Sequence, residues 1–193
     1  MKDLIKFISI GVTVCGMLAV VSAQTNVTAV AKVDLTRYAG KWYEIGRYPN
    51  RFQKKCVGNT TATYTLKPNG KVEVRNECIV KNGSTEVAVG EAKIVDKATN
   101  AKLKVRFAPG VLAFLPFVWG DYWIIDLDND YTHVAIGEPG RQYFWILSRQ
   151  PTLDDKTYQD ILRRAEAMGF DPARVVKTPQ GVEVLKGAVI IKH

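Results

Sequence analysis

The sequence predicts an all-β fold, an eight-stranded antiparallel up-and-down barrel followed by one C-terminal α-helix. Stretches in which apolar and polar residues alternate recur between about residues 40 and 149, and turn signals separate them. One amphipathic helix is indicated after them, over about 152–168, and no internal repeat is present. Short connections favour pairing of each strand with the next one, which is the arrangement of an up-and-down barrel.

The strand boundaries have local causes. Asn69 with Gly70, and Asn82 with Gly83, are pairs that tolerate positive φ and therefore mark tight hairpin turns. The expected strands are 41–48, 57–67, 71–80, 85–95, 102–107, 119–127, 131–137 and 142–149. A barrel of this size is filled by its own side chains or holds one small ligand.

The helix is expected to begin at Thr152, a good N-cap residue, and to end at Gly169. Its apolar face repeats every three or four residues and would pack against the barrel. That face consists of Tyr158, Ile161, Leu162, Ala165 and Met168. Residues 178–193 form an apolar tail for which the sequence predicts no position.

The first 23 residues have the features of a secretory signal peptide. Lys2 and Lys6 precede an uncharged, mostly apolar stretch from Phe7 to Val21, and small residues follow at positions 22 and 23. Its removal leaves residues 24–193 as a single exported domain. A length of 193 residues suits one hydrophobic core.

The cysteines fit an exported protein. Cys15 lies within the signal and follows Val14, whereas lipid attachment to a bacterial lipoprotein requires a small residue there. A released protein is therefore favoured over a lipid-anchored one. The remaining pair, Cys56 and Cys78, suggests a disulfide. The hairpin register offsets the two by several residues, so a bend near the start of the second strand is needed to bring them together.

Two stretches at the ends of the predicted barrel carry distinctive residues. The first strand begins with the sequence GKWYEI from Gly40 to Ile45, and the last ends with WILSR from Trp145 to Arg149. Both would lie at the base of the barrel. A guanidinium on an indole face stabilises by about 0.5–2 kcal/mol. We therefore predict that Gly40, Trp42 and Arg149 form a structural clasp that closes the sheet.

These motifs resemble those of the lipocalin family, over about residues 33–180. GKWYEI matches the first family motif, Asn129 to Tyr131 matches the second with Asn in place of the usual Thr, and Arg149 after WILS matches the third. The sequence looks most like the group that holds the bacterial outer-membrane lipocalins, apolipoprotein D and the plant temperature-induced lipocalins. The resemblance implies binding and transport of small apolar molecules, such as fatty acids or lysophospholipids, without catalysis.

The expected binding site is the interior of the barrel. Inward positions follow from alternation along strands five and eight, and Tyr122 is preferred to Trp123 by similarity to apolipoprotein D. The expected lining residues are Phe52, Leu103, Val105, Phe107, Tyr122, Tyr143, Trp145 and Leu147. Phe52 and the apolar loop from Val111 to Phe117 are expected at the open end, where the polar head of an acyl chain would stay.

The net charge of +8 favours anionic surfaces, among them phospholipid headgroups. Scattered lysines on a soluble surface are the plainer interpretation, because no run of five like charges occurs. We expect a lipid ligand, a possible peripheral membrane contact, and a monomer or dimer. The expected compartment is the periplasm or outer membrane of a bacterium, or the cell exterior for a eukaryote.

Other functions have less support in the sequence. No His, Cys and Asp cluster has metal-ligand spacing and no Gly-rich phosphate loop is found, so no catalytic residue, metal or cofactor is predicted. Basic residues interleaved with aromatics also occur in proteins that bind single-stranded nucleic acid, but export and the barrel motifs argue against that partner. A lipocalin-type enzyme and a partner-binding protein with a filled barrel remain as alternatives.

Overall fold

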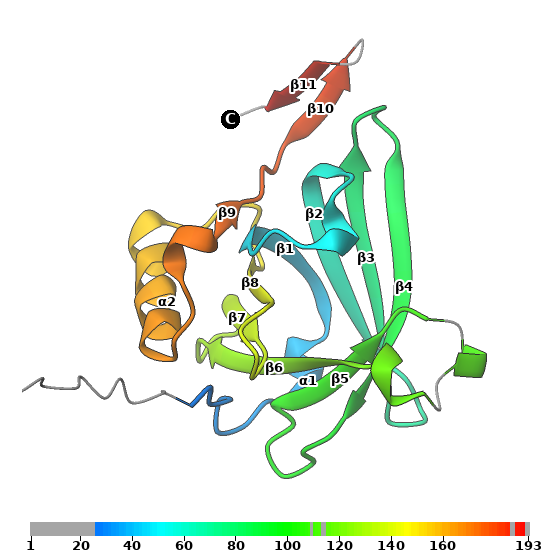
Figure 1. Cartoon of the computed structure of the whole chain (residues 1–193), viewed down its shortest axis with the longest axis vertical. Helices are drawn as coiled ribbons and strands as arrows, with labels where there is room; N and C mark the ends of the chain where they lie inside the picture. Colours follow the sequence, from blue (N-terminus) through cyan, green and yellow to red (C-terminus); the bar gives the residue numbers. More distant parts are fainter. Residues whose placement is uncertain (1–25, 109, 113–114, 186–187, 192–193) are drawn as a thin grey trace, which may run out of the picture.

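The predicted barrel is confirmed. A computed structural model describes residues 26–108, 110–112, 115–185 and 188–191. The barrel strands are β1 (Gly40–Arg47), β2 (Cys56–Leu66), β3 (Val72–Val80), β4 (Thr85–Ile94), β5 (Lys102–Arg106), β6 (Gly120–Leu127), β7 (His133–Gly137) and β8 (Phe144–Ser148). Each pairs antiparallel with the next, and β1 pairs with both β2 and β8, which closes the sheet (Figure 1). The predicted signal peptide and Cys15 lie outside the described residues.

The up-and-down topology gives the barrel two distinct ends. The short helix α1 (Leu35–Tyr38) leads into β1 at what we call the closed end, where Asp34 caps its first turn. The turns that follow β2, β4 and β6 share this end because the strands alternate in direction. The other end, called the open end, carries the β3–β4 turn and the β1–β2, β5–β6 and β7–β8 connections, including η1 (Arg51–Gln53), η2 (Gly110–Leu112) and η3 (Pro116–Val118).

The predicted helix is present as α2 (Asp155–Ala167), on the outside of the barrel. Its N-cap is Asp154, whose side chain accepts from the Thr157 amide, so the prediction of Thr152 as the cap was wrong. The carbonyl of Thr152 instead accepts from the Ser148 hydroxyl. The apolar face of α2 packs on the outer side of β1, β7 and β8, together with Phe170.

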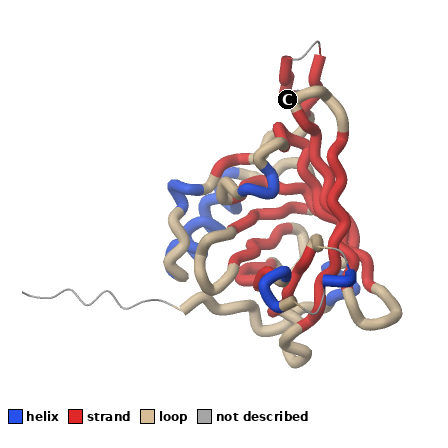
Figure 2. The backbone as a smooth tube through the Cα atoms, turned by 45° about the vertical axis from the view of Figure 1, so that its right-hand side comes forward, coloured by secondary structure: helices blue, strands red, loops and turns tan. Residues whose placement is uncertain are grey.

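The described part of the tail, which the sequence left unplaced, follows a short strand and forms a strap and a hairpin. After η4 (Pro172–Arg174), β9 (Val176–Lys177) pairs with the end of β1. Residues 178–182 then form a strap over the barrel wall. A final hairpin of β10 (Val182–Leu185) and β11 (Ala188–Ile191) extends beyond the barrel (Figure 2).

The strap fills the seam where β1 and β2 part. Their pairing ends at Tyr43 and Thr61. Just past that point, the Gln180 side-chain amide donates to the carbonyls of Glu44 and Thr60, at 2.8 and 3.0 Å. The Asn59 side chain holds the next part of the strap through the backbone N–H and C=O of Val182. The strap thus replaces the missing ladder bonds at the open end.

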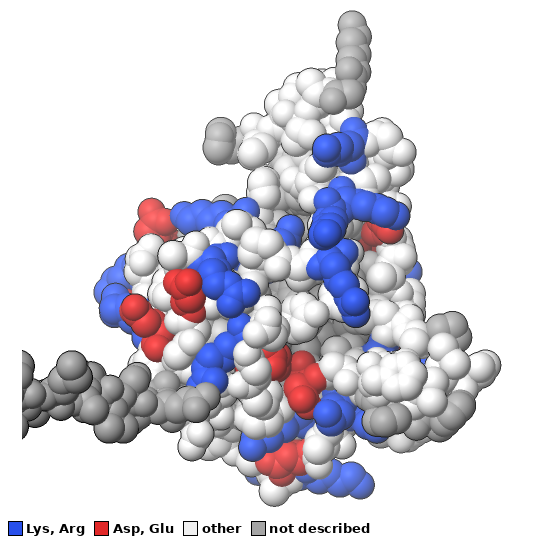
Figure 3. All heavy atoms as spheres, viewed as in Figure 1, with Lys and Arg blue, Asp and Glu red and all other residues white. Residues whose placement is uncertain are grey.

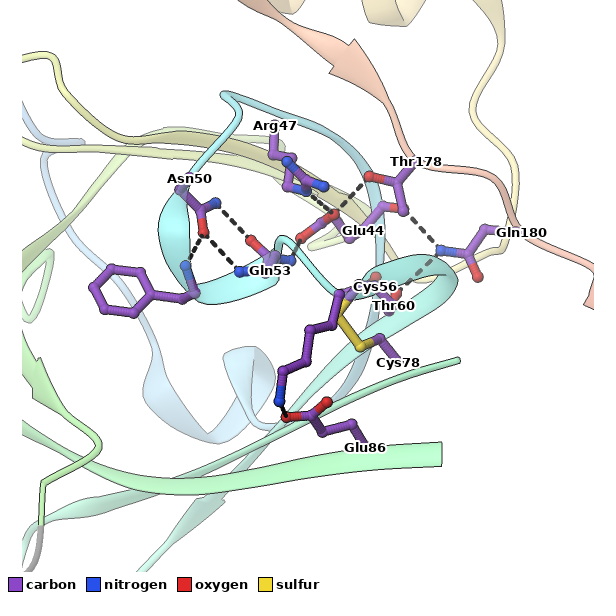
Figure 4. The surroundings of a disulfide bond; sticks show 12 residues. Glu44, Arg47, Asn50, Gln53, Cys56, Thr60, Cys78, Glu86, Thr178 and Gln180 are labelled. Atoms are coloured by element: carbon purple, nitrogen blue, oxygen red, sulfur yellow. Dashed lines mark hydrogen bonds and ion pairs between the residues drawn. A yellow bond between two sulfur atoms is a disulfide. The ribbon is translucent and has the colours of Figure 1, made fainter. Parts of the chain in front are cut away.

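Two irregularities in β2 bring the cysteines together. The β2–β3 register shifts between Cys56 and Gly58 and again between Gly58 and Thr61. Asn59, inside the second shift, has φ 51°. The bend that these bulges produce places the Cα atoms of Cys56 and Cys78 5.6 Å apart, and a disulfide joins them (Figure 4). The predicted disulfide and the bend that it required are both present.

We expect loss of this disulfide to destabilise the protein without unfolding it. The bond spans a sequence separation of 22, and the chain-entropy model gives about 3 kcal/mol for a loop of that size. Urea unfolding of the double variant Cys56→Ser, Cys78→Ser should show this loss. Added reductant should lower the stability of the parent and leave that of the double variant unchanged. Two free thiols by labelling of the exported protein would contradict the bridge.

Candidate ligand cavity

The closed end is organised around a buried indole. Trp42 has no exposed surface, and its indole N–H donates to the Tyr38 carbonyl at 2.8 Å. The Arg149 guanidinium carbon lies 3.8 Å from the centre of the Trp42 ring. Gly40 has φ +94° and a Cβ there would lie 3.4 Å from an Arg149 nitrogen, so glycine allows both the turn and the close approach.

Arg149 also anchors the chain that leads into β1. Its N–H groups donate to four carbonyls at the end of α1 and the start of β1, at 2.6 to 3.1 Å, and to a fifth in the β6–β7 turn at 3.3 Å. These carbonyls belong to Arg37, Tyr38, Ala39, Lys41 and Tyr131. One side chain therefore connects the last barrel strand to the first and caps a helix end that lacks intrahelical donors.

The second motif lies beside this contact. The Tyr131 hydroxyl accepts from the backbone N–H of Asp34 at 2.8 Å, and the Arg37 guanidinium carbon lies 4.1 Å from the centre of the Tyr131 ring. Tyr131 sits in the β6–β7 turn with φ 59° and is not part of a strand. The three motifs, distant in sequence, therefore meet at the closed end.

A cavity lies above α1, inside the barrel. Its empty space, including the side open to solvent, is about 380 Å³, although the enclosed part is close to the size of one water molecule. The lining residues come from α1, the residue after it, and strands β2 to β6: Leu35, Tyr38, Ala39, Tyr64, Leu66, Val72, Val74, Ala92, Leu103, Val105, Tyr122 and Ile124. Three tyrosine hydroxyls are the only side-chain polar groups among these residues.

The three hydroxyls contact one another. The Tyr122 oxygen lies 2.6 Å from that of Tyr38 and 2.8 Å from that of Tyr64. Burial raises the pKa of Tyr64 to about 12 and those of Tyr38 and Tyr122 well above the usual value. Desolvation of the phenolate is the main cause in each case. The hydroxyls of this cluster, which we call the tyrosine trio, therefore stay protonated.

Comparison with known proteins identifies the family. A model of the lipocalin-like domain matches residues 33–180. Temperature-induced lipocalin-1 of Arabidopsis thaliana is 44% identical over 153 residues, covering 78% of this chain and 81% of the relative. The chain belongs to the lipocalin family. The outer membrane lipoprotein Blc of Escherichia coli K12 is 38% identical over 156 residues, covering 80% of this lipocalin and 84% of Blc.

Two further comparisons agree. Apolipoprotein D of Macaca fascicularis is 32% identical over 154 residues, covering 76% of this lipocalin and 77% of that chain. Insecticyanin of the tobacco hornworm Manduca sexta has the same fold, with a TM-score of 0.63 at 21% identity, covering 80% of this lipocalin and 85% of that chain. Lipocalins bind small hydrophobic ligands and are generally not enzymes.

The predicted lining residues occupy three regions of the lipocalin. Leu103, Val105 and Tyr122 line the cavity. Leu147 is buried in the same interior core, and Trp145 is partly buried against it. Phe107 follows the end of β5 at the open rim and is 44% exposed. Its ring lies against Gly90, and a Cβ added to Gly90 would come within 2.7 Å of that ring.

An aromatic row occupies another part of the open rim. The Trp145 ring stacks on that of Tyr143, with ring centres 5.8 Å apart, and Phe52 lies 5.9 Å from Tyr143. The Trp145 indole N–H donates to the Gln53 side chain at 3.1 Å. Tyr143, which was predicted to line the interior, directly precedes β8, and its ring stacks on that of Trp145, which packs against the interior core.

A buried carboxyl lies behind this row, next to the strap. Glu44 is 3% exposed, and its oxygens accept from Gln53 at 2.6 Å and Thr178 at 2.5 Å (Figure 4). Arg47 lies 3.2 Å away as an ion-pair partner. Desolvation raises the pKa of Glu44, and these partners oppose the rise. Glu44 thus connects the strap to the loop that positions Trp145.

Cations surround the open end. Arg51, Lys54, Lys55 and Lys81 are exposed on its loops, and of these Lys55 pairs with Glu86 at 3.5 Å. Lys and Arg are more abundant than Asp and Glu over the face in Figure 3. The exposed apolar residues Phe52, Val111 and Phe117 lie on loops at the same end. An amphipathic molecule with an anionic head would meet complementary groups there.

Metal-ligand groups and membrane-spanning helices are both absent from the part of the chain that the structure describes. Among the described residues, His, Cys, Asp and Glu form no group suited to a metal ion. Within the same ranges, the helices are too short and too polar to cross a membrane.

Sequence reasoning missed two members of the tyrosine trio. Tyr64 alternates with polar residues in the second strand, so its inward direction was visible in the pattern. Tyr38 had no such signal, because a single helical turn carries too few residues to define a face. The contact between the trio hydroxyls depends on three elements far apart in sequence.

Replacement of Arg149 by Ala should lower the free energy of unfolding by about 2–4 kcal/mol, because it removes both a cation–π contact and charge-assisted hydrogen bonds. Arg149→Lys keeps the charge but offers a single ammonium, so its loss should be smaller. Denaturant unfolding measures both. Ligand preference should not change. Unchanged melting with lost binding would contradict a structural role and favour a ligand contact.

Stability should fall as the pH rises from about 10 to 12. The unfolded tyrosines ionise near 10, whereas Tyr64 in the folded state keeps its proton until about 12. Below about pH 10 the contribution of Tyr64 to the free energy of unfolding is fully present, because the residue is protonated in both states. Above that pH only the unfolded state loses its proton, which lowers the free energy of unfolding by about 1.4 kcal/mol per pKa unit, or by about 3 kcal/mol for Tyr64. Melting curves and tyrosinate absorbance across this range measure it. Tyr64→Phe should show a smaller loss, and an equal loss would contradict the assignment.

Proposed function

We propose that this lipocalin binds and carries or stores fatty acids or lysophospholipids in the cell envelope. The main support is the apolar cavity inside a closed barrel, which alkyl and aromatic side chains surround. Burying an acyl chain there is favourable by about 0.8 kcal/mol for each CH₂ group. The family as a whole binds ligands of this general kind.

The polar head of such a ligand is assigned to the open end. Arg51, Lys54 and Lys81 are exposed there and suit a carboxylate or phosphate group. Glu44 is the nearby carboxyl, but it is buried and held by its own partners. The same cations, with the exposed Phe117, support a peripheral contact with an anionic membrane.

Export supports the envelope location. The first 23 residues carry the features of a signal peptide, and the Cys56–Cys78 disulfide suits an oxidising compartment. The relative Blc is by name an outer membrane lipoprotein. We propose a periplasmic or outer-membrane-associated protein for a bacterial source, and a secreted one for a eukaryotic source.

A filled barrel is the second candidate, with a role in binding a partner through its surface. The narrow enclosed space favours it, because an acyl chain enters only if side chains at the rim move. Trp145 and Phe107 are the rim residues whose movement would widen the path, since both lie where β5 and β8 meet the open end. Ligand binding separates the two candidates.

Trp145→Glu should weaken binding of a fluorescent fatty acid at least about tenfold, which corresponds to about 1.4 kcal/mol. The new carboxylate would replace an apolar ring against the interior core, at a position next to the acyl chain. Val95→Glu is the matched control, because Val95 is 55% exposed outside the barrel, and it should bind as the parent does. Circular dichroism checks that both fold.

Two outcomes would reject the carrier function. The first is that Trp145→Glu binds as tightly as the parent. The second is that the parent binds no lipid of any class, which would support the filled barrel.

A further inference from the structure

The Trp145 ring is joined to a loop at the open end of the barrel. Trp145 belongs to β8 and packs on the interior core, whereas Gln53 is the last residue of η1, in the β1–β2 connection. The indole N–H of Trp145 donates to the side-chain oxygen of Gln53 at 3.1 Å. One hydrogen bond therefore connects the last barrel strand to a loop that lies 92 residues away in sequence.

The orientation of the Gln53 amide follows from neighbours that can only donate. The backbone N–H groups of Phe52 and Gln53 both donate to the side-chain oxygen of Asn50 at 3.1 Å. The NH₂ group of Asn50 therefore points away from them and donates to the Gln53 oxygen at 2.7 Å. The indole N–H of Trp145 is a donor as well, so it needs the same oxygen. Gln53 thus directs its own NH₂ group elsewhere.

That NH₂ group donates to a buried carboxyl. The distance from Gln53 to one Glu44 oxygen is 2.6 Å, and Thr178 and Arg47 lie against the other oxygen, at 2.5 and 3.2 Å (Figure 4). A carboxylate accepts from all three partners, and such charge-assisted bonds are the stronger ones. Glu44 therefore holds Gln53 in the orientation that presents an acceptor to Trp145.

The ring that Gln53 holds lies on the way into the barrel. Phe52, Tyr143 and Trp145 form a row with ring centres 5.9 and 5.8 Å apart. At the outer end Phe52 is 66% exposed, and the guanidinium carbon of Arg51 lies 4.9 Å from its ring centre. Trp145, at the inner end, packs on the interior core. Because the enclosed part of the cavity is close to the size of one water molecule, an acyl chain that follows this row has to displace the Trp145 ring.

We propose that Gln53 is a positioning residue that holds Trp145 across the ligand path and thereby limits the rate at which an acyl chain enters. Entry breaks the bond between Trp145 and Gln53, which we call the latch. The bonds from Gln53 to Asn50 and Glu44 remain and keep the acceptor in place for the ring to return. This inference rests on the proposed function, because it requires that an acyl chain enters the barrel.

The first test is the variant Gln53→Met, which removes the acceptor and keeps a side chain of similar length. The probe is parinaric acid, a conjugated fatty acid that fluoresces when it is buried, and stopped-flow fluorescence measures its association. The association rate constant should be about fivefold higher than in the parent, the ratio that the net strength of one hydrogen bond supports. Gln159→Met, at an exposed position of α2, is the matched control and should bind at the rate of the parent.

A second substitution distinguishes the latch from a general loosening of the loop. Trp145→Phe removes the N–H donor while Gln53 keeps its bonds to Asn50 and Glu44, and it should also speed association. In the Trp145→Phe background, Gln53→Met should change the rate less than about twofold, because the bond is already absent. An equal acceleration by Gln53→Met in both backgrounds would mean that the loop alone controls entry, and it would overturn the proposal.

The indole N–H supplies a readout that needs no ligand. In nuclear magnetic resonance spectra, the Trp145 N–H signal is assigned by its loss in Trp145→Phe. Its exchange with solvent should be slow in the parent and faster in Gln53→Met, and an equal rate in the two proteins would contradict the latch. The N–H of Trp42, which donates to the Tyr38 carbonyl at the closed end, should exchange at the same rate in both and serves as the internal control.

The outcomes separate this inference from the proposed function. If the probe binds and associates no faster with Gln53→Met than with the parent, the latch is wrong while the carrier function stands. If Gln53→Met does not fold, Trp145→Phe carries the kinetic test: faster association supports the latch, and a rate equal to that of the parent overturns it. If the parent binds neither the probe nor any other lipid, the carrier function fails and the proposed role of Gln53 in ligand entry fails with it.

Discussion

The barrel depends on the way β1 is held between its two neighbours. β1 is the only strand that must pair with both the second and the last strand of the barrel, and it pairs with β8 through a register shift between Glu44 and Gly46. At its start, Arg149 fixes the chain through backbone carbonyls and covers Trp42. Closure of the sheet is thus secured by a side chain from the last strand, acting on the chain that enters the first.

The two ends of β1 are secured by different means. The closed end uses Arg149 and the packed ring of Trp42, both within the family motifs. At the open end, β1 and β2 separate, and Gln180 and Asn59 hold the strap across the gap. The Cys56–Cys78 disulfide fixes the bulged start of β2 beside it. The open end therefore gains its order from the tail and the disulfide, in place of continuous strand pairing.

The fold was accessible from sequence because its determinants are local. Asn69 and Gly70 specify a hairpin turn, and the alternation of β5 identifies its inner face. The site was harder. Leu103 and Val105 were found because alternation extends along a regular strand, whereas Tyr122 was chosen over Trp123 by resemblance to apolipoprotein D.

Long-range contacts account for the rest. The strap was invisible in the sequence, because Gln180 acts by bonding two carbonyls of distant strands, and a glutamine in a tail has no pattern that predicts this. The same holds for Tyr38, which reaches the cavity only because α1 closes the barrel. The sequence shows which residues are apolar or polar, and the topology decides which polar groups meet.

Two buried polar clusters in this lipocalin differ in where they lie. Glu44 receives donors from Gln53 and Thr178 and an ion pair from Arg47, so its burial is compensated by the wall of the barrel itself. The hydroxyls of the tyrosine trio contact one another inside the apolar cavity, where they are the only side-chain polar groups of the lining. The Glu44 cluster therefore holds the barrel wall together, whereas the trio lies where a ligand in the cavity would meet it.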